Sequence, residues 1–193
     1  MACHGDAMPN HIKSVVTIRG PREEIQKLLD LALKPVKKEE QVLYGTDHRF
    51  DFSAIVPEPE DVVASEIESS TCLSGKLQLP LWYTWRVKHW GTKWNSYDFR
   101  SILEMDESTP DVVGNVKYVF AFSTAWSCPC PIFIACVKRF PKLRFTVEYA
   151  DEDIGHNCGT VSVRYDERKD KGFFAKMERE NEPEFANKVW ETY

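Results

Sequence analysis

The chain has 193 residues, 42% of them hydrophobic and 12% aromatic, which suffices for the core of one folded domain and excludes global disorder. Its formal net charge of −5 argues against broad, non-specific nucleic-acid binding, which needs a basic surface, but leaves room for a local basic patch. An acidic protein can also bind a basic protein partner, including one that normally grips nucleic acid.

The first third of the chain predicts a strand, a helix and a second strand. A β-branched run marks a strand over Lys13–Arg19. A helix follows from Pro21, with apolar residues on one face, and ends at Pro35. Residues 37–40 are a solvated charge run, and a second strand over residues 50–55 stops at a Pro-Glu-Pro sequence. Residues 60–78 are acidic, Ser-rich and weakly periodic, which predicts a variable, mobile insertion.

The stretch Leu79–Asn95 contains four of the six tryptophans. Pro80 suits the start of a helix and Gly91 suits a left-handed cap at its end. We therefore expect an aromatic helix here, which needs either the core or a ligand to cover its rings.

The second half of the chain predicts further strands and two helices. Alternating aromatic and β-branched residues indicate strands near residues 97–103, 118–122, 145–149 and 161–165. A helix begins near Pro131, and a last short helix begins near Pro183. The residues expected to point inward are Ile132, Phe133, Cys136, Val137 and Phe140 in the first helix, and Phe185, Ala186, Val189 and Trp190 in the second.

This order predicts an α+β, ferredoxin-like sandwich with a mainly antiparallel sheet, helices packed on one face, an inserted aromatic helix and a C-terminal helix. We expect the ferredoxin-like domain to span residues 8–166, with residues 60–78 as its variable insertion. Residues 167–193 are expected to form a charged linker and a C-terminal helix packed on the same domain.

Several stretches together resemble the YubB-type ferredoxin-like domain family of plasmids, phages and prophages. They are Met8–His11, Phe52–Pro59, Trp90–Asn95, Phe122–Ser127, Tyr149–Gly155 and Asn157–Gly159. The resemblance covers residues 8–165 and implies a ferredoxin-like fold and an accessory gene of a mobile element. It implies no agreed reaction, and the Cys128-Pro-Cys130 sequence departs from the family pattern.

The first candidate site is Trp90-Gly-Thr-Lys93-Trp94-Asn95. Trp90 and Trp94 can stack on a base or sugar while Lys93 holds a phosphate. The alternative, which we favour, is a helix end pinned by two core tryptophans with a solvated Lys93.

The second candidate site follows a strand, at Trp126 and Ser127. Free N–H groups at the next helix can hold an anion. We favour instead a helix cap from Ser127 or a neighbour, with Trp126 packed inside. If this site meets the first, the two form one pocket.

The third candidate site is the acidic run of Asp151, Glu152 and Asp153. These carboxylates can coordinate a hard cation, act as acid and base, or face a partner's basic groove. We favour the alternative that they form a solvated loop. Zinc at Cys128, Cys130, His156 and Cys158 is disfavoured because the spacing is wrong for a finger. No nucleophile or phosphate-loop motif is present. We therefore expect no metal, no cofactor and no catalytic residue.

The family resemblance, the acidic charge and the lack of a catalytic motif together favour a non-enzymatic accessory protein of a mobile element, which we expect to be a binding inhibitor of a bacterial defence system such as a CRISPR effector. The alternative is a domain that binds a small ligand, a nucleotide or single-stranded nucleic acid through a tryptophan-lined pocket; an enzyme that uses Asp151 to Asp153 is the weakest hypothesis. No signal peptide or transmembrane run is visible, so we expect a cytoplasmic protein with free cysteines and no membrane partner. The partner's identity and the oligomeric state are left open.

Overall fold

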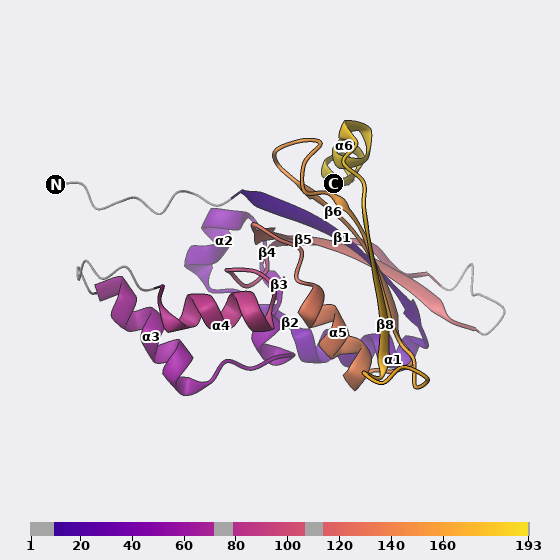
Figure 1. Ribbon diagram of the computed structural model, residues 1–193, viewed down its shortest axis with the longest axis horizontal. Helices are drawn as coiled ribbons and strands as arrows, with labels where there is room; N and C mark the ends of the chain where they lie inside the picture. The colour runs from indigo at the N-terminus through magenta and orange to yellow at the C-terminus, as the bar shows by residue number, and fades with distance from the viewer. Residues whose placement is uncertain (1–9, 72–78, 107–113, 193) are drawn as a thin grey trace.

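A computed structural model describes residues 10–71, 79–106 and 114–192. Its centre is a six-stranded sheet in the order β4-β5-β1-β6-β7-β8, in which every neighbouring pair is antiparallel (Figure 1). The strands are β1 (His11–Gly20), β4 (Tyr97–Asp106), β5 (Val116–Ala125), β6 (Arg144–Asp151), β7 (Gly159–Tyr165) and β8 (Phe173–Arg179).

The ferredoxin-like unit consists of β1, β4, β5 and β6 with the helices α1 (Arg22–Ala32) and α5 (Cys130–Arg139). Both helices lie on one face of the sheet, as predicted (Figure 1). Alternate strand residues point to this face, because side chains in a strand alternate between the two sides. The core beneath the helices includes the fully buried rings of Phe120, Phe122, Phe133 and Phe145.

The C-terminal helix α6 (Pro183–Glu191) packs on the opposite face from α1 and α5 (Figure 1). Its Ala186 and Val189 are buried against Val15, Val119 and other small residues of the sheet. Phe185 and Trp190, also expected to point inward, are partly buried there. The helix covers the end of the sheet where β1 begins and β6 ends, which leaves the other end of this face open.

The segment before α6 is not only a linker. Residues 173–179 form the edge strand β8, which pairs with β7 along its whole length. The sequence predicts no strand there, because no apolar alternation marks these residues. In the structure most of them are exposed. The edge position of β8 explains this, since an edge strand needs little core-facing surface and is often charged.

The chain between α1 and β4 contains more structure than expected. It forms the two-stranded sheet β2 (Leu33–Pro35) and β3 (His48–Phe50), the helix α2 (Lys38–Tyr44), a 3-10 turn (Phe52–Ala54), α3 (Glu60–Thr71) and α4 (Leu81–His89). Residues 38–40 of the predicted solvated charge run thus form the first turn of α2. The predicted strand over residues 50–55 ends at Phe50, because the Asp51 carboxylate accepts a hydrogen bond from Ser53 N and turns the chain into the 3-10 helix.

Most of the predicted 60–78 insertion is the helix α3, and residues 72–78 lie outside the described residues, as do Met8 and Pro9 of the first matching stretch. α3 buries Val62, and its Ser65 Oγ accepts a hydrogen bond from Trp82 N of α4 at 3.0 Å. Because α3 buries so little of its surface, its sequence shows only weak helical periodicity. No helix in the described ranges is long and apolar enough to cross a membrane.

Candidate functional site

Trp90 is a core residue. Its side chain is fully buried directly after α4, and its Nε1 donates a hydrogen bond to the Val56 carbonyl at 3.0 Å. Its ring meets Phe52 and Trp85 edge to face, each at 5.8 Å between centroids. Because both the ring and the N–H are used internally, Trp90 offers no face for stacking on a ligand. The favoured interpretation of this residue agrees with the structure.

Lys93 is buried rather than solvated, with 6% of its surface exposed. Its Nζ lies 5.2 Å from the ring centroid of Trp94 and 5.0 Å from that of Trp126. Two aromatic faces attract the ammonium group and compensate part of its lost hydration. Within the described residues, no carboxylate forms an ion pair with Lys93. The expected solvated lysine is therefore wrong, because the chain brings Trp126 over it from a distant strand.

Asn95 ties the 3-10 turn to the start of β4. Its Oδ1 accepts hydrogen bonds from Phe52 N and Ser96 N, both at 2.9 Å. Its Nδ2 donates to Asp51 Oδ1 at 2.6 Å. The amide group therefore acts as a structural clamp.

Trp126 and Ser127 meet the first tryptophan stretch, but hydrogen bonds from side chains to backbone carbonyls join the two segments where the sequence suggested a pocket if they met. Ser127 Oγ donates a short hydrogen bond to the Gly91 carbonyl, and Thr92 Oγ1 donates to the Ala125 carbonyl at 2.7 Å. The helix α5 begins at Cys130 without a side-chain cap, so the expected Ser127 cap is wrong. Trp126 is 39% exposed and has a φ of +69°, so it is not packed inside either.

Gly91 supplies the left-handed cap that the sequence predicted, with a φ of +82°. A Cβ at this position would lie 2.6 Å from Pro131 Cδ. We expect Gly91→Ala to lower the free energy of unfolding by about 3 kcal/mol, because backbone strain and a clash with a rigid ring add together. Urea denaturation measures this. Gly45→Ala is the matched control, since Gly45 has a φ of +67° but no atom within 4 Å, and an equal loss in both variants would contradict the clash.

Asp151 joins the ends of three strands. Its carboxylate is buried and accepts hydrogen bonds from Asn10 Nδ2 at 3.0 Å, Asp153 N at 3.0 Å and Asn157 Nδ2 at 3.1 Å. Asn157 Nδ2 also donates to the Trp126 carbonyl at 3.0 Å. Asp151 therefore holds the start of β1, the end of β5 and the end of β6 together. Sequence reasoning had overlooked Asn10 and Asn157, although both lie in stretches that carried the resemblance.

The other two acidic residues point to different partners. Glu152 Oε1 accepts a hydrogen bond from His11 N at 3.1 Å, while Asp153 is exposed with His156 Nδ1 at 3.6 Å. The three carboxylates therefore do not converge on one point. In the described part of the chain, no three His, Cys, Asp or Glu side chains are grouped to hold a metal ion.

The described cysteines are free thiols, and Cys128, Cys136 and Cys158 are buried. Burial raises the pKa of Cys128, whereas the hydrogen bond with Cys128 lowers the pKa of the half-buried Cys130. Cys158 Sγ donates to the Glu180 carbonyl at 2.6 Å, and burial raises its pKa. Cys158, directly before β7, is therefore held by the backbone carbonyl of Glu180.

Lys13 is buried under α6, with Nζ 4.6 Å from the Trp190 ring centroid. Burial lowers its pKa from 10.5 to about 8; Asp98 opposes this shift and Arg100 adds to it. Between these two values the unfolded chain binds more protons than the folded one, so stability contributed at this site rises with pH in that window. The free energy of unfolding of the wild type, relative to that of Lys13→Met, should therefore rise between about pH 8 and about pH 10.5. Below about pH 8 the difference should stay constant. Paired urea titrations across this range test this, and a constant difference would contradict it.

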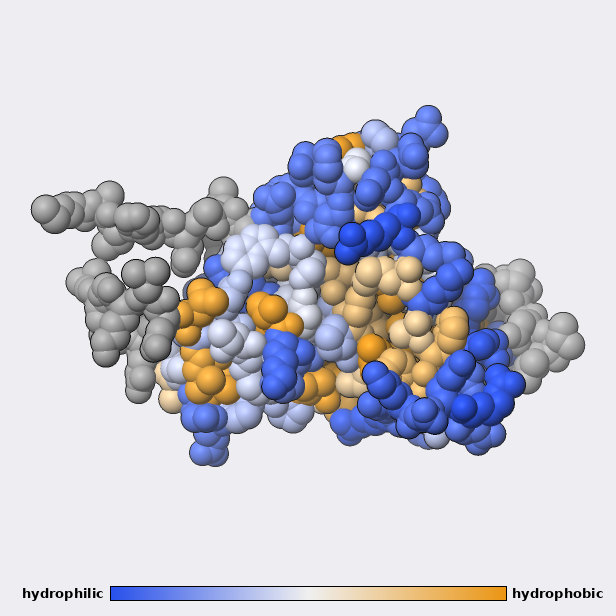
Figure 2. All heavy atoms as spheres, in the orientation of Figure 1, coloured by the Kyte–Doolittle hydropathy of each residue, from blue (hydrophilic) through white to orange (hydrophobic). Residues whose placement is uncertain are grey.

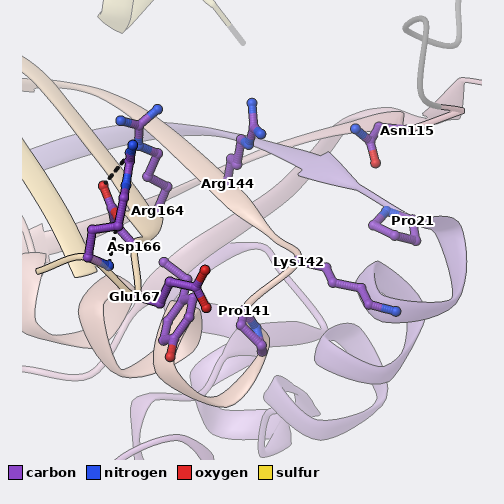
Figure 3. Close-up of a pocket in the computed structure, with 10 residues that line it drawn as sticks. Pro21, Asn115, Pro141, Lys142, Arg144, Arg164, Asp166 and Glu167 are labelled. Atoms are coloured by element: carbon purple, nitrogen blue, oxygen red, sulfur yellow. Dashed lines mark hydrogen bonds and ion pairs between the residues drawn. The ribbon is translucent and has the colours of Figure 1, made fainter. Parts of the chain in front are cut away.

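Two hollows on the surface are large enough to be considered as ligand sites. One of about 400 Å³ is bordered by Trp90, Trp94 and Asn95 together with charged residues. Another of about 520 Å³ lies at the opposite end of the sheet from Asp151, among Arg144, Arg164 and the turn before β6 (Figure 3). Trp126 lines neither of them, so the predicted single pocket of Trp90 and Trp126 does not form there.

These features define a ferredoxin-like α+β domain whose candidate residues mainly hold strand ends together. A family model described as the ferredoxin-like domain in Api92-like protein matches residues 89–192. This is more than half of the chain, which therefore belongs to that family. Neither a search of curated proteins nor a search of solved structures yields a match.

Proposed function

We propose that this chain is a non-enzymatic accessory protein of a mobile genetic element that binds and inhibits a bacterial defence system, with a CRISPR effector as the expected target. The resemblance to the YubB-type family of plasmids, phages and prophages supports the setting. The internal hydrogen bonds of Asn95, Ser127 and Asp151 support a binding role, because they leave these groups no evident catalytic task.

The observation that carries this proposal is the apolar surface of α3 and α4, which we call the α3–α4 arm. Val63 and Ile67 of α3 are 43% and 65% exposed, and Leu81 and Val87 of α4 are 46% and 42% exposed. Hydrophobic residues gather over these two helices on the face in Figure 2. Exposed apolar groups that gather in this way favour a protein-binding surface.

The charges at the first turn of α3 favour a basic partner. Glu60 and Asp61 are exposed at the first turn of α3, beside its apolar residues. A protein that grips nucleic acid presents the complementary positive surface. An effector of a CRISPR system has that property, which makes it a suitable target for the arm.

The test is phage plating on bacteria whose CRISPR effector targets the phage, with the chain expressed in the cells. The wild-type chain should restore plaques and bind the purified effector. Ile67→Glu places a charge in the middle of the arm and should weaken binding by about 30-fold, as for a central interface residue. Ile154→Glu, at a 38% exposed position off the arm, is the matched control. The proposal would be overturned if expression of the wild-type chain changed phage plating for none of the CRISPR types tested.

A second candidate function rests on the hollow of about 400 Å³ beside Trp94. Its cations are paired, Arg49 with Glu40 and Arg86 with Glu58, so it suits an uncharged ring such as a nucleoside better than a phosphate. Tryptophan fluorescence should then shift on adding nucleosides and stay constant in Trp94→Phe. A flat response of the wild-type chain to the whole panel would rule this function out.

A further inference from the structure

Four cations form a row across four neighbouring strands. The register places Lys117 of β5 opposite Arg19 of β1, Arg19 opposite Arg144 of β6, and Arg144 opposite Arg164 of β7. Adjacent strands are about 4.8 Å apart, so the row spans about 14 Å. We call these four residues the basic row.

The basic row lies on the face of the sheet that α1 and α5 do not cover. Its strand neighbours Ile18, Phe145 and Val163 are buried in the core below those helices, and side chains alternate along each strand. Arg19, Arg144 and Arg164 are exposed, because α6 covers only the other end of this face. The row is therefore open to a partner.

The basic row is electrostatically unfavourable in the isolated chain. Like charges directly opposite each other on paired strands destabilise a sheet. In the described part of the chain, no carboxylate forms an ion pair with Arg19 or Arg144. Two acidic residues border the same hollow as Arg144 and Arg164: Glu167, and Asp166, which is paired with Arg168 at 3.0 Å. In the strand register, Asp106 is opposite Lys117. A polyanion would relieve this repulsion, which explains why a chain of net charge −5 concentrates cations here.

Hydroxyl groups lie in the next row of the same face. Thr17 is opposite Thr146, and Thr146 is opposite Ser162. Thr146, Ser162, Arg144 and Arg164 border a hollow of about 340 Å³ together with Phe174. Phosphate oxygens accept hydrogen bonds from both arginine and hydroxyl donors, so this hollow offers the donors that a phosphate needs.

An aromatic ring stands at the end of the basic row. Phe174 of β8 is opposite Arg164, and the guanidinium carbon lies 4.9 Å from its ring centroid. Arg144 and Arg164 project in the same direction above the turn that holds Lys142, beside the hollow of about 520 Å³ (Figure 3). Cations beside an aromatic ring are the arrangement that binds unpaired nucleotides, since phosphates meet the cations and a base stacks on the ring.

We propose that this open sheet face binds the sugar-phosphate backbone of single-stranded nucleic acid. The arginines of the basic row contact phosphates, Thr146 and Ser162 donate hydrogen bonds to them, and Phe174 stacks on one base. An anionic membrane is disfavoured because, among the residues that the structure describes, no group of apolar side chains accompanies the cations on this face to enter a bilayer. This surface is separate from the α3–α4 arm, so the proposal does not depend on the function proposed above.

The experiment is a fluorescence anisotropy titration of the full chain with labelled DNA and RNA single strands of about 12 nucleotides, a length within the usual site sizes. Log affinity should fall linearly with log salt with a slope of about −2 to −3, as expected for three or four neutralised phosphates. A duplex of the same length should bind more weakly, because its bases cannot stack on Phe174.

The variant Arg144→Glu/Arg164→Glu should lose binding. The matched control is Lys37→Glu/Lys88→Glu, which makes the same charge change at exposed lysines before β4 and should keep it. If the first variant fails to fold, Arg144→Gln/Arg164→Gln removes both charges without reversing them, keeps polar side chains, and should make the salt slope shallower by about 1.4. Ile67→Glu should leave oligonucleotide binding unchanged, which separates this result from the test of the arm.

Three results would overturn the proposal. One is no salt-dependent binding of any oligonucleotide by the wild-type chain. Another is equal affinity in the arginine variants and the lysine control. The third is binding to phosphatidylserine vesicles without binding to oligonucleotides.

Discussion

Trp90→Ala is expected to lower the free energy of unfolding by about 4 kcal/mol, a typical loss for aromatic truncation in a core. The substitution empties a fully buried site between Phe52 and Trp85. It also leaves the Val56 carbonyl without its indole donor. Because Phe52 is itself fully buried in the core, it has little freedom to move into the cavity.

Trp126→Ala is the matched control, since it removes the same side chain from a position that is 39% exposed. Its expected cost is about 1 kcal/mol, because less apolar area returns to water. Urea denaturation followed by circular dichroism measures both variants without relying on tryptophan emission. Equal losses would contradict the division of the aromatic stretch into a core ring and a surface ring.

The central strands β5 and β6 were predictable because their residues alternate between the core below the helices and the opposite face of the sheet. Phe145, Val147 and Tyr149 of β6 alternate with residues on the opposite face, and so do Tyr118 and Phe120 of β5. The helix α3 lacked such a signal, since in its described part Val62 alone is buried. Amphipathic periodicity records how much surface an element buries, so elements that bury little leave a weak pattern.

The candidate sites were harder to predict because their partners lie far away along the chain. Lys93 is covered by Trp126, and Asn95 binds Asp51 across 44 residues. The cations Arg19, Arg144 and Arg164 are unremarkable singly and become a row only through strand register. The sequence therefore identified the right segments near Trp90 and Asp151, while their roles followed from contacts that no local spacing encodes.

Arg86 anchors α4 to the preceding segment through two glutamates. Its Nε donates to Glu58 Oε1 at 2.6 Å, and its Nη1 donates to Glu66 Oε1 at 2.8 Å. The guanidinium carbon lies 5.2 Å from the Trp82 ring centroid and 5.1 Å from that of Trp90. Burial lowers the pKa of Arg86, but the hydrogen bonds that it donates to both carboxylates raise the pKa by more, so the group stays charged.

Arg86→Met should lower the free energy of unfolding by about 4 kcal/mol, because it strands the Glu58 carboxylate, whose side chain is only 9% exposed, without a counter-ion. Adding Glu58→Gln removes that charge and should recover about half of the loss. The pair of Arg100 and Asp98 gives the control, since its side chains are 55% and 26% exposed and Arg100→Met should cost less than about 1 kcal/mol. These values come from urea denaturation of the three variants and the wild type. No recovery in the double variant would mean that the cost lies in the lost contacts of Arg86 with Trp82 and Trp90, rather than in the unpaired carboxylate.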